Sequence, residues 1–340
     1  MKTRLPLLEC IPNFSEGRDR IKIDKIASAI RSVEGVELLH IDISPAANRT
    51  VMTFAGLPQS VSEAAFRAIQ CAAEEIDMQT QTGVHPRIGA TDVCPFVPLS
   101  NIHLEEANEI VNNLCKRVGN ELKIPIYLYE HSAKNESRKA LPDLRRGQYE
   151  GLEEKMKQPN WIPDNKVVFN AKAGATVMGV RDILVAFNIS LNTDKIEVAN
   201  FIASRIRERG RKENGKYVAG ILPKVRAIGW YMADYNCVQV SFNLLDYRIT
   251  SLLQVWQTCE MLAAEAGVEL VGSEVIGLIP ERCLIEAGTF SFLRKNESVP
   301  KDNLVLIESA RSFLGLNKLK PFDPREKVLE YALEHAGLLS

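Results

Sequence analysis

One order of predicted strands and helices occurs twice in this chain, once in each half. Apolar periodicity predicts the order strand–helix–strand–strand–helix–strand in the first half, over residues 7–11, 24–33, 36–43, 50–54, 60–76 and 93–99. The second half repeats this order over residues 183–191, 194–206, 225–232, 238–244, 250–266 and 268–279. The repeat therefore constrains the chain to two copies of one architecture.

The repeated order is that of the βαββαβ, or ferredoxin-like, unit. We therefore predict an α/β (α+β) fold of two ferredoxin-like domains, over residues 1–180 and 181–340. A helix over 104–118 and a strand over 124–129 extend the first copy. The charged stretch 141–164, which contains three prolines, is a connection ahead of the boundary, and a helix over 324–338 closes the chain.

Two of the predicted helices begin with the spacing of a capping box, in which an N-cap side chain and an acidic residue three positions later satisfy each other's backbone N–H groups. Ser60 precedes Glu63 in the first half, and Asp194 precedes Glu197 in the second. We expect both helices to start at these residues.

Charge and hydropathy exclude two classes of partner. The 340 residues include 42 Lys and Arg against 43 Asp and Glu, and the resulting net charge of −1 argues against nucleic-acid binding. No run of about 18 apolar residues is present, so no membrane partner is expected. Because the N-terminal segment lacks a secretory signal and the seven Cys are scattered without a C-x-x-C pair, we predict a cytoplasmic protein with no disulfide framework and no cysteine-based zinc site.

The densest group of reactive side chains lies at residues 83–92, which we call the histidine loop. Two glycines and a proline constrain its backbone, and it leads directly into a strand. It carries His85, Arg87 and Asp92. An imidazole, with an unperturbed pKa of about 6.5, suits proton transfer at neutral pH. On spacing alone, His85 is either a catalytic group or a surface histidine beside a turn.

The other four histidines are weaker candidates. His40 lies on the polar face of an alternating strand, His103 opens a helix, His131 follows a strand, and His335 lies in the last helical turn. No two of the five histidines have the spacing of metal ligands, so we predict no metal site.

Three further polar clusters interrupt apolar runs. They occupy residues 12–17, 45–50 and 169–176, and each is explained either by turn chemistry or by close approach of a ligand to the backbone. The basic residues between Arg205 and Lys216 form either a solvated helix end or a surface that attracts a polyanionic ligand.

Several of these segments resemble the formiminotransferase family, which comprises glutamate formimidoyltransferase and the formiminotransferase portion of formiminotransferase-cyclodeaminase. The likeness runs in register over nearly the whole chain. Its longest match is His-Pro-Arg-Ile-Gly-Ala-Thr-Asp-Val-Cys-Pro-Phe at residues 85–96. Other matching segments lie at residues 9–17, 48–51, 174–177, 186–189, 229–231, 243–246, 271–273 and 321–324.

The resemblance implies transfer of the formimino group from N-formimino-L-glutamate to tetrahydrofolate, giving 5-formiminotetrahydrofolate and glutamate, in histidine degradation. It implies two ferredoxin-like subdomains with a folate-binding tunnel between them, a catalytic histidine at His85, tetrahydrofolate as co-substrate without a metal, and a homodimer. The family's folate-binding stretch aligns with Lys166, Val167, Val168, Phe169, Asn170, Ala171, Lys172, Ala173 and Gly174.

The chemistry of this transfer predicts the remaining site residues. A folate nitrogen must lose a proton as it attacks, so the reaction needs a general base, and the imidazolium of His85 then returns the proton to the departing amine. Asp42 is the candidate that orients or stabilises this base. Both substrates carry carboxylates, which predicts a set of substrate-binding side chains: Arg49 and Arg87 as guanidinium clamps, and Asn13 and Asp92 as polar positioning groups.

Two other functions stay open. A glutamate formyltransferase acting on N-formylglutamate or 5-formyltetrahydrofolate would use the same site, because the two transferred groups differ only by O in place of NH. A non-catalytic folate-binding or ACT-like regulatory module would have the same fold. Because residues 321–330 match the end of the transferase portion, we expect a stand-alone enzyme that is paired with a separate cyclodeaminase.

Overall fold

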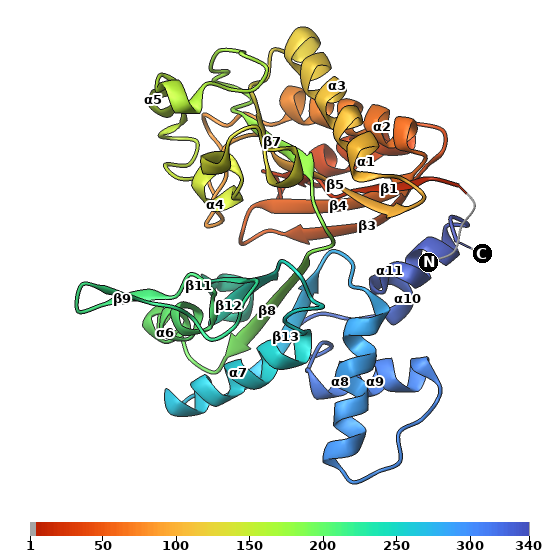
Figure 1. Ribbon diagram of the computed structural model, residues 1–340, viewed down its shortest axis with the longest axis vertical. Helices are drawn as coiled ribbons and strands as arrows, with labels where there is room; N and C mark the ends of the chain where they lie inside the picture. The colour runs from red at the N-terminus through yellow and green to blue at the C-terminus, as the bar shows by residue number, and fades with distance from the viewer. Residues whose placement is uncertain (1–4, 340) are drawn as a thin grey trace. The chain divides into compact units, whose positions relative to one another are not determined.

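The computed structural model describes residues 5–339 and divides into two compact units, each of mixed α/β structure (Figure 1). The first unit runs up to Arg181 and takes in the segment that starts at Ala336, and the second runs from Asp182 to His335. The predicted α/β class is confirmed. The predicted domains, 1–180 and 181–340, differ from this division chiefly in the segment after Ala336, which we assigned to the second domain.

A seven-stranded sheet forms the first unit. The first predicted strand, 7–11, forms β1, and a short strand that was not predicted, β2, follows Pro12. Both pair antiparallel with β4 on one side and β5 on the other. β3 lies beyond β4, and β7 and β6 continue the sheet beyond β5 in parallel orientation. The strands are β1 (Leu7–Cys10), β2 (Asn13–Phe14), β3 (Val36–Ser44), β4 (Arg49–Gly56), β5 (Thr91–Ser100), β6 (Ile126–Leu128) and β7 (Thr176–Val180).

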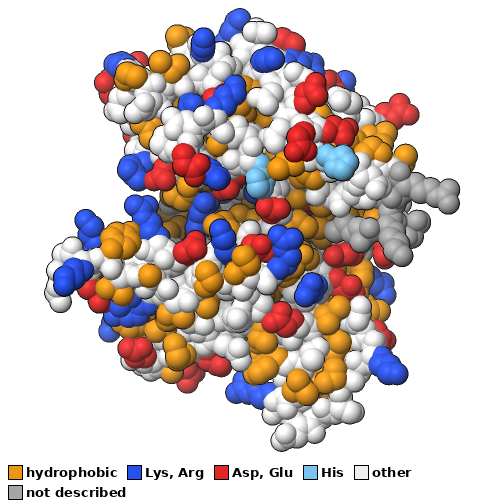
Figure 2. Space-filling view, viewed as in Figure 1, with side chains coloured by type: hydrophobic (Ala, Val, Ile, Leu, Met, Phe, Trp, Pro, Cys, Tyr) orange, Lys and Arg blue, Asp and Glu red, His pale blue; other side chains and the backbone are white. Residues whose placement is uncertain are grey.

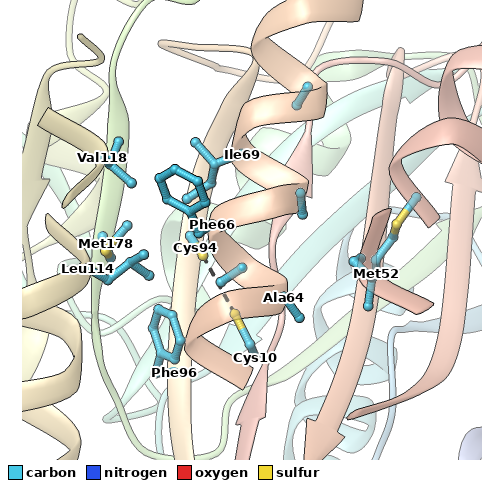
Figure 3. Packing of buried hydrophobic residues seen from close by; sticks show 14 of the residues in the cluster. Cys10, Met52, Ala64, Phe66, Ile69, Cys94, Phe96, Leu114, Val118 and Met178 are labelled. Carbon is cyan, nitrogen blue, oxygen red and sulfur yellow. Dashed lines mark hydrogen bonds between the residues drawn. The ribbon is translucent and has the colours of Figure 1, made fainter. Parts of the chain in front are cut away.

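Three helices cover one face of this sheet: α1 (Arg20–Arg31), α2 (Pro58–Glu75) and α3 (Leu104–Leu122) (Figure 1). Their apolar stripes and the sheet close one core, in which Cys10, Phe66 and Phe96 lie close together (Figure 3). Short elements follow β6 and surround a smaller apolar cluster: η1 (Glu130–Ser132), η2 (Glu136–Arg138), α4 (Leu141–Leu144), α5 (Leu152–Met156) and η3 (Pro159–Trp161).

The second unit has a four-stranded antiparallel sheet in the order β11-β12-β8-β13. Its strands are β8 (Val185–Leu191), β11 (Val225–Met232), β12 (Cys237–Leu244) and β13 (Leu270–Ile276). Apolar residues of α6 (Ile196–Ile206) and α7 (Leu252–Glu265) share a core with the sheet. The remaining elements are β9 (Arg211–Glu213), β10 (Lys216–Val218), η4 (Ala233–Tyr235), α8 (Glu281–Arg294), α9 (Asn303–Phe313), α10 (Pro324–Lys327) and α11 (Leu329–His335).

Both sheets arrange the four strands of the repeat in the same way. If β1 and β2 are counted as one strand, the order across each sheet is second, third, first, fourth. In both units a helix joins the first strand to the second and the third to the fourth, as the sequence pattern predicted. The ferredoxin-like assignment itself stays a prediction.

Several predicted helix ends are wrong. α2 begins at Pro58 and α6 at Ile196, and neither has a side-chain cap hydrogen bond, so the capping boxes at Ser60 and Asp194 do not form. Proline has a fixed φ and no N–H to satisfy, which suits the first helical position and starts α2 two residues early. A capping box does form at Ser251, before α7. The single helix predicted at 324–338 is divided into α10 and α11.

Charged side chains of both signs are interspersed over the face shown in Figure 2, as a net charge of −1 leads one to expect. Within residues 5–339, no helix combines the length and the apolar character needed to cross a membrane. All seven cysteines have free thiols.

Candidate active site

Two of the polar clusters hold the histidine loop in place. From the cluster after the first strand, Ser15 Oγ donates a hydrogen bond to the carbonyl oxygen of Gly89 at 2.7 Å. From the cluster between β3 and β4, Asn48 Nδ2 donates to the carbonyl oxygen of Thr82 at 2.8 Å. The two clusters therefore have a shared structural role, because they fix both ends of the loop that carries His85.

The cluster at residues 169–176 lies backbone to backbone with the same loop. The Ala90 N–H donates to the carbonyl oxygen of Ala173 at 2.8 Å, and Gly89 pairs with Gly174 in an isolated β-bridge. A Cβ on Gly89 would lie 2.2 Å from the carbonyl oxygen of Ala175, and Gly174 has a φ of +67°. Only glycines allow this close approach, which places the end of the predicted folate-binding stretch against the histidine loop.

A buried ionic cluster, which we call the Arg–Asp–Arg cluster, contains Arg49, Asp92 and Arg145. Asp92 is fully buried, and its Oδ2 accepts from Arg49 Nη1 at 2.8 Å and from Arg145 Nη2. Its Oδ1 accepts from the Ile88 N–H at 2.9 Å. Burial raises the pKa of Asp92, but the two guanidinium groups outweigh it and bring this pKa to about 2. The cluster therefore carries one net positive charge at neutral pH.

Arg49 is held between Asp92 and Asn13. Its Nε donates to Asn13 Oδ1 at 3.0 Å, and Asn13 Nδ2 donates to the carbonyl oxygen of Ile11 at 2.9 Å. Burial and the charge of Arg145 lower the pKa of Arg49 to about 10, against the attraction of Asp92. Among the described residues no acceptor binds Nη2 of Arg49, whose side chain is 7% exposed.

His85 is partly buried at the edge of this cluster. Its Nδ1 lies 2.8 Å from the carbonyl oxygen of Pro86, and because a carbonyl only accepts, Nδ1 carries the proton. The lone pair is then on Nε2. Burial lowers the pKa of His85 well below its usual value of 6.5, and the charges of Arg49 and Arg145 lower it further. The imidazole is therefore neutral at pH 7 and able to accept a proton.

Arg87, which we predicted to be a substrate clamp, is already bound within the protein. It is 6% exposed, and its Nη1 and Nη2 donate to the two carboxylate oxygens of Glu150 at 2.9 and 2.6 Å. Its Nε donates to Gln81 Oε1 at 2.7 Å, Nη2 to the carbonyl oxygen of Gln81 at 3.1 Å, and Nη1 to Gln148 Oε1 at 3.3 Å. Because all five N–H groups have acceptors, a substrate carboxylate would have to displace Glu150.

Asp42, the predicted partner of the base, lies on β3 beside His40. Its Oδ2 is 3.7 Å from His40 Nε2. The carboxylate whose charge acts on the pKa of His85 is Asp92. The orienting role that we predicted for Asp42 therefore stays a prediction, and the charge of Asp92 raises the pKa of His85.

The predicted folate-binding stretch has two parts. Its first part offers apolar side chains: Val168 is 80% exposed, and the ring of Phe169 lies 6.0 Å from that of Tyr149. Its second part is tied to the protein, since Asn170 Oδ1 accepts from the Ala173 N–H at 2.9 Å and the Ala173 side chain is buried in the core. The first part can contact a ligand with side chains, whereas the second shapes the backbone.

Two site residues were missed in the sequence. Arg145 and Glu150 both lie in the stretch 141–164, which we interpreted only as a connection. This stretch has no helical or strand periodicity that would place its side chains. Its one signal was the pair Arg145 and Arg146, of which Arg146 is exposed and binds Asp143. Sequence alone does not distinguish these two arginines.

No group of three or more His, Cys, Asp or Glu side chains that could hold a metal ion occurs among the described residues.

Two family models together match most of the chain. The formiminotransferase domain, N-terminal subdomain, matches residues 7–181, and the formiminotransferase domain matches residues 186–334. Among solved structures, a microcompartment protein from Desulfitobacterium hafniense covers 79% of this chain and 93% of its own at 12% identity, with a TM-score of 0.21, which is too weak to carry an argument.

Curated relatives are much more similar. The formimidoyltransferase-cyclodeaminase of Mus musculus is 42% identical over 332 residues, which cover 97% of this chain and 60% of that protein. The chain thus spans 60% of the length of this bifunctional relative. The glutamate formimidoyltransferases of Thermoplasma acidophilum and Streptococcus pyogenes are each 41% identical, covering 84% of this chain and 92% of their own lengths. On these matches, the chain belongs to the formiminotransferase family.

Proposed function

We propose that this chain transfers the formimino group of N-formimino-L-glutamate to tetrahydrofolate, with His85 as the general base. Two relatives of this chain at 41% identity bear the name glutamate formimidoyltransferase. The observation that carries the proposal is a neutral imidazole, with its Nδ1 proton held by Pro86, beside an ionic cluster of net positive charge. Such a site suits proton transfer between two substrates that carry carboxylates.

In the proposed reaction, N5 of tetrahydrofolate attacks the formimino carbon and forms a new C–N bond. The proton that N5 loses passes to Nε2 of His85. The tetrahedral adduct then breaks the C–N bond to the glutamate nitrogen, and the imidazolium returns the proton to the departing amine. The ring ends neutral, so the cycle is balanced in protons, and this general acid–base contribution is about 10² to 10⁴ in rate.

The Arg–Asp–Arg cluster binds a substrate carboxylate in this proposal. Arg49 directs its Nη2 edge to the ligand, while Asp92 holds Arg49 and Arg145 together. The cluster is fixed before the substrate arrives, so the orientation of the reactants contributes to the rate. Positive charge also keeps His85 neutral, which preserves the base in its reactive form.

Tetrahydrofolate is the co-substrate, and we propose that it contacts Val168 and Phe169 in the first part of the stretch Lys166–Gly174. The exposed side chain of Val168 and the tilted ring pair of Phe169 and Tyr149 support this assignment. The cytoplasmic location, the homodimer and a place in histidine degradation, all expected from the sequence, belong to the same proposal.

A turnover assay tests the proposed function. The purified chain is mixed with N-formimino-L-glutamate, and release of glutamate is followed with and without tetrahydrofolate. We expect one glutamate per 5-formiminotetrahydrofolate formed and none without the folate. His85→Gln should lose at least about 10²-fold in kcat, whereas His103→Gln, a matched change at the N-cap of α3, should keep the wild-type rate.

The same assay separates the alternatives. Faster turnover of N-formylglutamate, or of glutamate with 5-formyltetrahydrofolate, would identify a formyltransferase instead. Binding of tetrahydrofolate without turnover of any donor would indicate a non-catalytic folate-binding module, and would contradict the role of His85.

A further inference from the structure

We propose that Lys155 is a positioning residue for the candidate active site, because its ammonium group fixes the short backbone segment that carries Arg145 to Asp92. The role of Lys155 in catalysis rests on the proposed function. The contacts that link Lys155 to the histidine loop rest on the geometry alone, and they can be tested without turnover.

The ammonium of Lys155 binds three carbonyl groups that flank Arg145 on both sides. Its Nζ lies 2.7 Å from the carbonyl oxygen of Leu144, 2.8 Å from that of Asp143 and 3.1 Å from that of Arg146. An ammonium group has three hydrogens and no acceptor, so these three bonds use all of its donors. These bonds hold the backbone on both sides of Arg145.

The backbone at this point needs such a group. α4 has only four residues, and the last carbonyls of a helix lack partners within the helix. A lysine ammonium is a favourable partner for these carbonyls, since it supplies both hydrogen bonds and a positive charge at the negative end of the helix. Leu144, which is buried, anchors the segment on its apolar side.

Lys155 itself is held in place by its surroundings. Its Nζ lies 3.9 Å from the ring centroid of Trp161, a favourable arrangement of a cation and an aromatic face. Burial and the charge of Arg146 lower the pKa of Lys155 to about 8, although Asp143 opposes this. The side chain therefore remains mostly charged at pH 7.

The contacts continue from Arg145 to the base. Arg145 Nη2 and Nε both donate to the Asp92 carboxylate, and the charge of Arg145 is one of the two that lower the pKa of His85. The charged groups with the largest effects on the pKa of His85 are Arg49, Arg145 and Asp92. If Arg145 moves away, the imidazole loses a repelling charge and the carboxylate of Asp92 is less neutralised. Both changes favour the protonated ring.

The test is the pKa of His85, measured by NMR titration of the imidazole C–H signals, with the His85 signal assigned by its absence in His85→Gln. In Lys155→Met, which keeps the apolar stem, we expect this pKa to rise by roughly one pH unit. The matched control is Lys157→Met, because Lys157 is exposed on the same segment and pairs with Glu154. It should leave the pKa of His85 unchanged.

Two further variants keep the proposal falsifiable if Lys155→Met does not fold. Lys155→Arg retains a positive donor and should restore the wild-type pKa of His85. Lys155→Gln retains neutral donors and should give an intermediate value. In the turnover assay, we expect kcat/KM to fall about tenfold in Lys155→Met and its acid limb to move with the pKa of His85.

A folded Lys155→Met protein with a lowered melting temperature but an unchanged His85 pKa would overturn the proposal, since Lys155 would then be merely structural. Failure of the proposed function has a different signature. In that case the wild-type chain would not transfer the formimino group, while the pKa of His85 would still rise in Lys155→Met.

Discussion

The two units bury a carboxylate beside sheets of the same strand order, but they neutralise its charge in different ways. In the first unit, Asp92 lies between the guanidinium groups of Arg49 and Arg145. In the second, Glu274, which is 5% exposed, accepts hydrogen bonds at Oε1 from Asn188 at 3.2 Å and Gln239 at 3.1 Å, and a single cation among the described residues, the ammonium of Lys320, lies 3.4 Å from its Oε2.

The difference shows how one architecture supports two roles. Two arginines around one carboxylate leave excess positive charge. This charge disfavours the protonated form of His85 and so lowers its pKa. Around Glu274, one ammonium group, that of Lys320, balances the carboxylate without leaving excess positive charge, while amides donate to Oε1 and the Tyr235 hydroxyl donates to Oε2 at 3.1 Å. In our proposal the first arrangement prepares a base and an anion site, whereas the second links neighbouring strands.

The largest expected effect concerns the charge of Asp92. Asp92→Asn keeps the shape of the side chain but leaves two buried guanidinium groups without a counter-ion. We expect the free energy of unfolding to fall by about 3 to 5 kcal/mol, as measured by urea denaturation. A loss below about 1 kcal/mol would show that the Arg–Asp–Arg cluster is not held together by charge.

The next prediction distinguishes the role of Arg49 from that of Arg87. Arg49→Lys keeps the charge but removes the Nη2 edge, so the KM for N-formimino-L-glutamate should rise about tenfold. Arg87→Lys should instead lower the free energy of unfolding with little change in KM, because Glu150, Gln81 and Gln148 use all the donors of Arg87. A raised KM in Arg87→Lys together with an unchanged KM in Arg49→Lys would show instead that Arg87 binds the substrate carboxylate.

The smallest effect is expected in the second unit. In Glu274→Gln, the amide oxygen can still accept from Asn188 and Gln239, and the new NH2 group can donate to the Tyr235 hydroxyl. The cation that loses its counter-ion, Lys320, has a side chain that is 39% exposed, so water can solvate it. We expect a loss of only about 1 kcal/mol in urea denaturation and little change in the pKa of His85. A loss as large as that of Asp92→Asn would remove the distinction between the two buried carboxylates.

The sequence predicts the fold well because each copy of the repeat carries its own apolar periodicity. The same periodicity does not locate helix starts. Pro58 begins α2 ahead of Ser60, since a local preference for the first helical position prevails over the capping spacing.

The candidate site was predictable only where its residues lie in regular segments. Asn13, Arg49 and Asp92 lie in strands, so their meeting follows from the pairing of β2, β4 and β5, and His85 lies in the loop ahead of β5. Arg145 contacts Asp92 from the stretch 141–164, which has no periodicity. No sequence pattern indicates which residues of such a stretch pack against the sheet. The contacts of Arg87 could not be predicted for the same reason, because its acceptor Glu150 lies in the same stretch.

The pH dependence of kcat/KM tests the central claim, that neutral His85 is the base, most directly. The folded pKa of His85 lies below 6.5, so the ring stays neutral down to that lower pKa, and activity falls as the pH drops through it. We predict an acid limb with its midpoint below pH 6.5, equal to the His85 pKa from NMR titration and absent in the residual activity of His85→Gln. An acid limb that stays unchanged in His85→Gln, with turnover at the wild-type rate, would contradict the account.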